Sequence, residues 1–395
     1  MFWCHVNMPA PKSFFRLRLT LAGTCGALHK FHQHQHIDGV PTIIMSMCIT
    51  RKRARLDDDD TQDSAEGSQA LQVDGECPRK RDDDFWYDDG SIILVARDVE
   101  FRIYKGLLAD HSPVFKDMFS FPQPPNTTHD GTNPAGDPCP IVHLPDSPED
   151  LRHILRVCMP KSGSSPFKPA SNLSYHTVSA VIRLGHKYQM ADLVKDAVDY
   201  LKRWYTSVFD EWAAGRLYAP DAPFEHVHAI GVVNIARLVD EPLLLPSALL
   251  MCCSLDEDIV KGFAREDGTR ETLCPDDLGL CFAARKVFAG NMLVILASVF
   301  EAYVSGGCTD PQRCRNALQK MLLDGLRIPG AIPKIVHPDV LRSFVHFLGP
   351  CAVCASCQEM VRERDVDIRK RAWQTLPKIF KLEFGDGEWP GKLSI

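Results

Sequence analysis

The chain has 395 residues, which is long enough for two domains, and its 45% hydrophobic content is ordinary for a globular protein. A net charge of −6 argues against a chain-wide nucleic-acid footprint, and no apolar run reaches the roughly 18 residues of a membrane span. Because no secretory signal is convincing, we expect the 15 cysteines to be reduced intracellular thiols rather than a disulfide framework.

Residues 1–83 lack the apolar periodicity of a packed domain, and we interpret them as a disordered tail and linker. Residues 1–37 contain no acidic side chain, which is typical of a mitochondrial presequence, although a flexible tail has the same composition. A basic cluster follows, which nuclear import receptors can read and which also fits a solvated linker. The cluster consists of Arg51, Lys52, Arg53 and Arg55.

The segment from residue 91 to residue 119 predicts two strands followed by two short helices. Residues 92–95 are an apolar run long enough for a buried strand, and residues 100–103 alternate as a half-buried strand does. Ser112 and Pro113 are typical of a helix start, with the serine as N-cap and the proline at the first helical position. The apolar residues after them lie on one face at helical spacing.

This order resembles the BTB/POZ domain, in which a strand hairpin and a basic residue precede a leucine pair and a Ser-Pro helix. Tyr104 departs from that pattern, since the family most often has histidine there. The positions that match are Lys105, Leu107, Leu108, Ser112, Pro113, Val114, Phe115, Met118 and Phe119. The core that the resemblance implies consists of Leu94, Val95, Phe101, Leu107, Leu108, Val114, Phe115 and Phe119.

The predicted BTB/POZ domain spans residues 84–205 and continues with one strand and three helices. We expect the strand at residues 140–144, one helix from residue 146, and two more at 174–188 and 190–204. Residues 121–140 and 160–172 are exposed loops by composition, and both are longer than most BTB domains need.

Residues 206–395 are predicted to form an α-helical C-terminal domain, so the fold class is α+β: a small sheet flanked by helices, then helices alone. Apolar spacing favours helices at 227–238, 246–253, 275–296 and 313–323, and a charged helix begins near residue 359. The order is similar to that of a large set of BTB proteins in mushroom-forming fungi, which also have the segments 275–278 and 373–377. That similarity implies fold and boundaries, and little about activity.

Five of the cysteines lie between residues 308 and 357. Cys351 and Cys354 have the separation that one side of a tetrahedral thiolate site needs, and Cys308 and Cys314 supply two further sulfurs. These four could bind Zn²⁺ and tie two distant helical segments together, with Cys357 left over. The alternative is a set of small buried hydrophobic side chains and free thiols, without any cofactor.

The sequence contains no glycine-rich phosphate loop, G-x-S-x-G or H-E-x-x-H motif, and a nucleophile pair would need scattered residues such as Cys158 and His153. We therefore expect no catalytic site and a BTB adaptor or scaffold that binds other proteins. The resemblance implies a second BTB domain, a cullin or a transcriptional co-regulator as partner, without direct contact to nucleic acid or membrane.

Two alternatives stay open. A nuclear transcriptional regulator would share this fold and would use the basic cluster at residues 51–55 for import. An enzyme built on the helical region has only the cysteine cluster as support. The expected location is intracellular, either nuclear or cytoplasmic.

Overall fold

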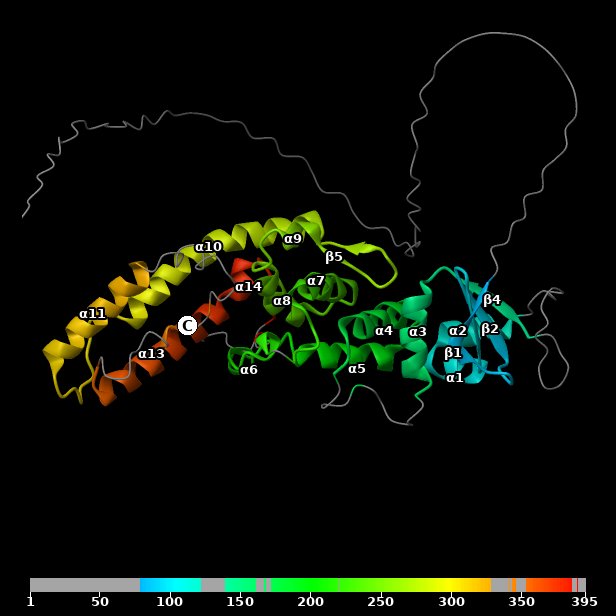
Figure 1. Cartoon of the computed structure of the whole chain (residues 1–395), viewed down its shortest axis with the longest axis horizontal. Helices are drawn as coiled ribbons and strands as arrows, with labels where there is room; N and C mark the ends of the chain where they lie inside the picture. Colours follow the sequence, from blue (N-terminus) through cyan, green and yellow to red (C-terminus); the bar gives the residue numbers. More distant parts are fainter. Residues whose placement is uncertain are drawn as a thin grey trace, which may run out of the picture. The chain divides into compact units, whose positions relative to one another are not determined.

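The computed structural model describes residues 79–121, 139–160, 167, 172–219, 221–327, 341, 343–345, 353–385 and 389 (Figure 1). The basic cluster at residues 51–55 and Cys351 lie outside the described residues. The described part begins with a small sheet and its helices and continues as a mostly helical region, which confirms the predicted α+β class.

Four strands form the sheet, in the order β1-β3-β2-β4. The predicted hairpin is confirmed: β2 (Ile92–Ala96) pairs antiparallel with β3 (Val99–Ile103). β4 (Ile141–Leu144) runs parallel to β2 at one edge, and β1 (Lys80–Trp86) runs parallel to β3 at the other. Every residue of β2 and β3 is buried, so the hairpin is the middle of the sheet.

Strand β1 begins inside the segment that its composition suggested to be linker, so that interpretation is wrong for residues 80–83. Its three consecutive aspartates are unusual in a strand, so the sequence pattern did not predict it. One of them, Asp82, is buried because its carboxylate has hydrogen-bond and ion-pair partners. The Asp82 carboxylate accepts the backbone N–H groups of Asp84 and Phe85 at 3.0 Å and pairs with Arg152 at 2.8 Å. The other charges point outward, as is favourable on an edge strand that must not pair with another chain.

The described residues of the first part also form the helices α1 (Lys105–His111), α2 (Pro113–Ser120), α3 (Pro148–Cys158), α4 (Tyr175–Lys187) and α5 (Ala191–Lys202). The helix starts follow the chemistry of the sequence. The hydroxyls of Ser112, Ser147 and Ser174 each accept the backbone N–H of the residue three positions later. Each cap satisfies a donor that the first helical turn would otherwise leave without a partner.

The described residues of the C-terminal region are mostly helical, and they include a hairpin of β5 (Phe263–Ala264) and β6 (Arg270–Glu271), which the sequence pattern did not predict. Three 3-10 turns, η1 (Arg216–Tyr218), η2 (His226–His228) and η3 (Pro242–Leu244), connect its first helices. Its α-helices are α6 (Phe209–Ala213), α7 (Ala229–Leu238), α8 (Leu245–Cys252), α9 (Asp258–Lys261), α10 (Pro275–Val299), α11 (Pro311–Arg327), α13 (Ala355–Gln374) and α14 (Leu376–Ile379).

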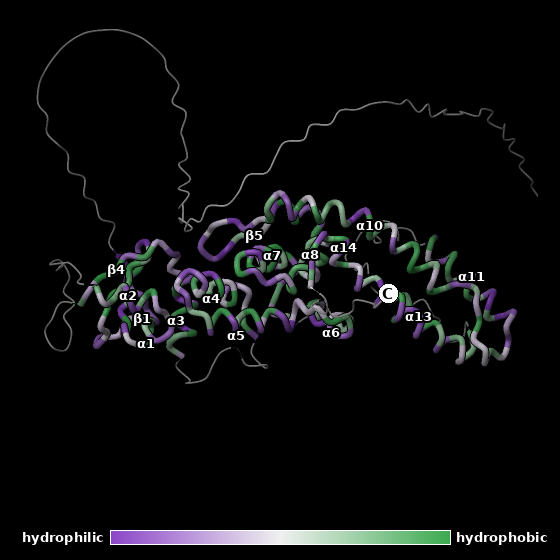
Figure 2. The backbone as a smooth tube through the Cα atoms, turned by 180° about the vertical axis from the view of Figure 1, so that it is seen from behind, coloured by the Kyte–Doolittle hydropathy of each residue, from purple (hydrophilic) through white to green (hydrophobic). Residues whose placement is uncertain are grey.

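Helices α7 and α8 are hydrophobic on nearly all sides (Figure 2), and every residue of α8 is buried. Helix α10 is also apolar, and within the described residues it alone is long and apolar enough to cross a membrane. One stripe of α10, which includes Cys281, Phe288 and Ile295, is buried, and the helix packs against α8 and α13. Other apolar side chains of α10, among them Phe282 and Val294, are exposed.

Two large hydrophobic cores organise the described residues. The first lies between the sheet and α1, α2 and α3 and contains Leu94, Phe101 and Phe115. The second joins α4 and α5 to the helices that follow, so apolar packing crosses the predicted boundary at residue 205. From the far end of the chain, the Trp373 indole N–H in α13 donates to the Ser207 carbonyl at 2.9 Å.

Candidate interaction surfaces and a cysteine cluster

Four of the eight predicted BTB core residues lie in the first core. Leu94, Phe101, Leu108 and Phe115 are at most 1% exposed, and Val95 is buried on the opposite face of the sheet. Two more residues, Val114 and Phe119, are partly buried and pack against the first core.

Leu107 does not belong to this core, because 44% of it is exposed. Helix α1 begins only at Lys105, so Leu107 and Leu108 stand about 100° apart on one short helix. Only one of two adjacent leucines can then face the sheet, and that residue is Leu108. The prediction that Leu107 is a core residue is therefore wrong, and Leu107 is an exposed apolar side chain on the surface of α1.

Ser112 connects the start of α2 to the end of α4 through a hydrogen bond. Its hydroxyl caps Phe115 at 3.0 Å and also donates to the Tyr188 carbonyl at 2.6 Å. The Phe115 ring stacks on the Tyr188 ring with centroids 4.3 Å apart. Burial and the neighbouring Asp146 raise the pKa of Tyr188, so its hydroxyl is a permanent donor to that carboxylate.

The β5–β6 hairpin lies against α3 and against the β2–β3 turn, and its contacts there are polar. Arg265 pairs with Asp150 at 2.6 Å, and Glu266 is 2.6 Å from Nε2 of His153. The hairpin also brings Asp267 within 3.8 Å of Arg97 in the β2–β3 turn. These are contacts between segments more than 110 residues apart in the sequence.

The base of the hairpin reaches α4 and α7 through Glu271, which is only 6% exposed. Its carboxylate accepts hydrogen bonds from Arg183, from the Tyr175 hydroxyl at 3.3 Å and from the Asn234 amide at 3.0 Å. A buried carboxylate is tolerated only when it is paired and hydrogen-bonded in this way. Glu271 therefore connects α4 to the hairpin and to α7 of the helical region.

The scattered pair Cys158 and His153 does not form an activated nucleophile. Both ring nitrogens of His153 are engaged, Nε2 by Glu266 and Nδ1 by the Thr177 hydroxyl at 3.1 Å. Burial raises the pKa of Cys158 to about 12, which keeps the thiol protonated at neutral pH. His153 instead contributes hydrogen bonds to Glu266 and Thr177, and Cys158 is a buried side chain of the first core.

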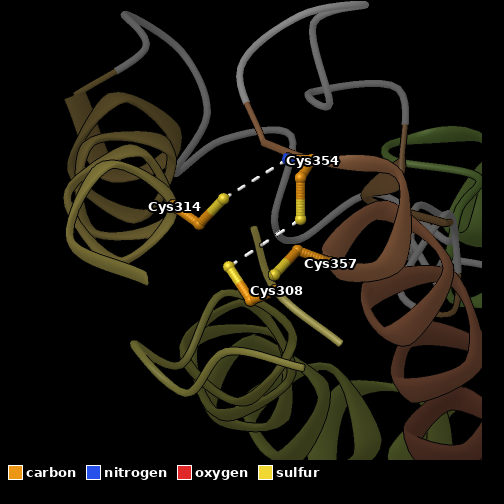
Figure 3. Close-up of side chains that lie close together, drawn as sticks. All are labelled: Cys308, Cys314, Cys354 and Cys357. Carbon is orange, nitrogen blue, oxygen red and sulfur yellow. Dashed lines mark hydrogen bonds between the residues drawn. The ribbon is translucent and has the colours of Figure 1, made fainter. Parts of the chain in front are cut away.

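Four cysteines converge near the start of α11 and the start of α13 (Figure 3). The sulfurs of Cys308, Cys314, Cys354 and Cys357 all lie within 4.8 Å of one another. The Cys354 and Cys308 sulfurs are 3.8 Å apart, and the Cys354 backbone N–H donates to the Cys314 sulfur at 3.3 Å. Cys314 and Cys357 are almost completely buried, and the other two are half-buried.

The pKa values of three of these thiols shift in different directions. Backbone hydrogen bonds from Thr309 and Cys357 lower the pKa of Cys354 to about 6. Burial raises the pKa of Cys357 to about 12 and also raises the pKa of Cys314. A thiolate at Cys354 is therefore available at neutral pH, whereas the buried thiols of Cys314 and Cys357 favour their protonated forms.

Three of the four cysteines are those that the spacing predicted, and the fourth is Cys357. The predicted fourth ligand, Cys351, lies outside the described residues. The sequence Cys351-x2-Cys354-x2-Cys357 contains the two-residue separation twice, so spacing alone gave no choice between the pairs. The position of the helix start could have distinguished the two pairs, since Cys354 is the N-cap of α13 and Cys357 lies in its first turn.

Comparison with known proteins agrees with this architecture. The sequence profile of the BTB/POZ domain matches residues 90–204, which covers β2 to the end of α5. A search of curated proteins found no match to the chain, so the similarity to fungal BTB proteins stays a prediction. Strands, capped helices and profile together identify residues 90–204 of this chain as a BTB/POZ domain, a fold that generally mediates protein–protein interaction.

Proposed function

We propose that this chain is a non-catalytic adaptor whose BTB/POZ domain binds a partner protein through the surface of α1. The observation that carries the proposal is Leu107, a large apolar side chain of the domain that is 44% exposed. A partner that covers this side chain would remove its apolar surface from water, which contributes about 25 cal/mol per Å² to binding. The helical region is the second module of the adaptor, and its partner is a different protein.

The junction between the two modules supports an adaptor that presents both in a fixed relation. The hairpin contacts α3 and α4, which leaves Leu107 on α1 accessible while the domain is docked. Charged pairs at Arg265 and a buried carboxylate at Glu271 give the junction a defined geometry. A partner held on α1 would thus keep a constant position with respect to the helical region.

The test is affinity purification of the full chain from cells, followed by mass spectrometry, with two matched variants. Leu107→Asp places a charge on the proposed surface, and Val366→Asp changes an equally exposed apolar side chain on α13. We expect Leu107→Asp to lose a set of proteins that Val366→Asp retains. Cullin peptides, co-regulators or a second copy of the chain in that set would each name the partner class. Identical sets for both variants would contradict the proposal.

A nuclear place of action is a second candidate, favoured by the basic cluster at Arg51, Lys52, Arg53 and Arg55. A fluorescent fusion of the chain and the same fusion with these four residues changed to alanine would be compared by microscopy. Nuclear import through the cluster requires the alanine variant to leave the nucleus. Equal distribution of both fusions would favour a linker role for the cluster.

A further inference from the structure

We propose that Cys308, Cys314, Cys354 and Cys357 bind one Zn²⁺ ion as a closed structural site (Figure 3). Among the described residues, this is a place where four metal-binding side chains converge, and all four ligands are thiols. The proposal goes beyond partner binding, because it assigns a folding role to the far end of the helical region.

The distances between sulfurs fit a tetrahedral ion and do not fit a disulfide. Four thiolates at about 2.3 Å from a central zinc are separated from one another by about 3.8 Å. The observed separation of the Cys354 and Cys308 sulfurs is 3.8 Å, and no pair of the four exceeds 4.8 Å. A disulfide would require about 2.05 Å. In Figure 3 the four sulfurs point toward a common space.

Each half of the site comes from a turn that leads into a helix. Cys308 closes a turn by donating its backbone N–H to the Ser305 carbonyl at 3.0 Å, and Cys314 lies in the first turn of α11. Cys354 is the N-cap residue of α13, and Cys357 follows in the first turn of that helix. Two helix N-termini therefore direct their positive ends toward the sulfurs, which favours thiolates there.

The two halves are already in contact around the sulfurs. A Cβ atom on Gly307 would lie 3.2 Å from the Ser356 hydroxyl, so the turn before α11 rests directly on the first turn of α13. The Cys354 backbone N–H donates to the Cys314 sulfur across the same boundary. Backbone donors to sulfur are the outer contacts that orient and stabilise thiolate ligands.

The ligand chemistry selects the metal. Thiolates favour soft or borderline cations, and four of them in tetrahedral arrangement are typical of structural zinc. Since the protein supplies all four ligands, no coordination position remains for water or substrate. The ion would join segments 46 residues apart in the sequence, and its binding energy would contribute to the folding of α11 against α13.

The primary test is elemental analysis of the full chain, purified with reductant and supplied with zinc. We expect about one equivalent of zinc that survives dialysis. Cys314→Ser and Cys357→Ser should each reduce the metal content several-fold. Cys351→Ser, which removes the neighbouring thiol of the competing pair, and Cys252→Ser, which removes a buried thiol elsewhere, should leave the metal content unchanged. Loss of metal in Cys351→Ser with retention in Cys357→Ser would overturn this ligand set.

A second measurement uses only the native chain, in case the serine variants fail to fold. Alkylation by iodoacetamide, read by mass spectrometry, should spare the four cysteines until a chelator is added. Substitution by Co²⁺ should give the visible absorption of a tetrahedral thiolate complex. Rapid alkylation of the half-buried Cys308 and Cys354 regardless of chelator, or a chain that carries iron in place of zinc, would refute the proposal.

Discussion

The Tyr175 ring lies flat on the His228 ring, with centroids 4.6 Å apart and planes 11° apart. Tyr175 starts α4 of the BTB/POZ domain, and His228 ends the turn before α7, so the stack forms part of the junction. Both side chains are buried, at 1% and 8% exposure. The imidazole therefore has to remain neutral while the junction is closed.

This neutrality makes the stability of the chain depend on pH. Burial, with a smaller effect of the neighbouring His176, lowers the pKa of His228 from 6.5 to about 4. Between these values the unfolded chain binds a proton that the folded chain does not, so stability is full above about pH 6.5 and falls as pH falls. We expect a loss of about 2 kcal/mol at pH 5 from this group. Thermal unfolding of the native chain and of His228→Gln across this range would measure it.

The matched control for the pH experiment is His111→Gln, which removes an exposed histidine at the end of α1. This variant should keep the pH dependence of the native chain, while His228→Gln should flatten it. Equal slopes for all three proteins would show that another group causes the effect.

Phe115 and Leu107 provide a contrast within one domain. Phe115→Ala should lower the free energy of unfolding by about 3–5 kcal/mol, because it empties a buried aromatic site that stacks on Tyr188. Leu107→Ala should change it by less than about 0.5 kcal/mol, since an exposed side chain loses little on truncation. Denaturant titration of both variants measures the two values. A cost of less than about 1 kcal/mol for Phe115→Ala would contradict the packing of α2.

Glu271→Gln tests the connection between the BTB/POZ domain and the helical region. The substitution keeps the shape but removes the charge that Arg183 faces in a mostly buried site, so we expect a loss of about 2–3 kcal/mol. Glu257→Gln is the control, because Glu257 pairs with Lys261 on the exposed surface, where an ion pair contributes little, so this change should leave the free energy of unfolding nearly unaltered. Calorimetry would measure the stability of the two variants against that of the native chain. If both variants cost equally little, Glu271 does not hold the junction.

Two glycines should respond to alanine in opposite directions. A Cβ atom on Gly231 in α7 would lie 1.7 Å from the Tyr175 hydroxyl oxygen, so Gly231→Ala should destabilise by about 1–3 kcal/mol. Gly279 in α10 has open space at the same position, and Gly279→Ala should stabilise by about 0.5–1 kcal/mol through helix propensity. Thermal unfolding of the two variants compares the signs, and a stabilising Gly231→Ala would disprove the close approach of α7 and α4.

The sequence predicted those elements whose signals are local. The N-cap serines indicate where helices begin, because a cap depends only on the next three residues. They are Ser112, Ser147 and Ser174. Apolar spacing likewise found α7, α8, α10 and the hairpin of β2 and β3.

The elements that the sequence did not reveal depend on partners far along the chain. β1 is a strand because the charge of Asp82 is matched by Arg152, seventy residues later. The two strands of the β5–β6 hairpin have only two residues each, too few to show an alternating sequence pattern. Contacts with α3 and α4 stabilise the hairpin instead. The choice between Cys351 and Cys357 likewise requires knowledge of where α13 begins.

The hydrogen bond between Trp373 and Ser207 has a consequence for the order of folding during synthesis. The BTB/POZ segment leaves the ribosome first, and its sheet, α1, α2 and α3 hold the contacts of the first core, so this part can form while the helices that complete the second core against α4 and α5 are still being made. The helical region has to wait, because Trp373 packs beside Phe209 and Trp212 at its very beginning. Until α13 emerges, the apolar surface around residues 207–212 stays open, and nascent chains stalled in that interval are the ones most exposed to chaperones and to aggregation.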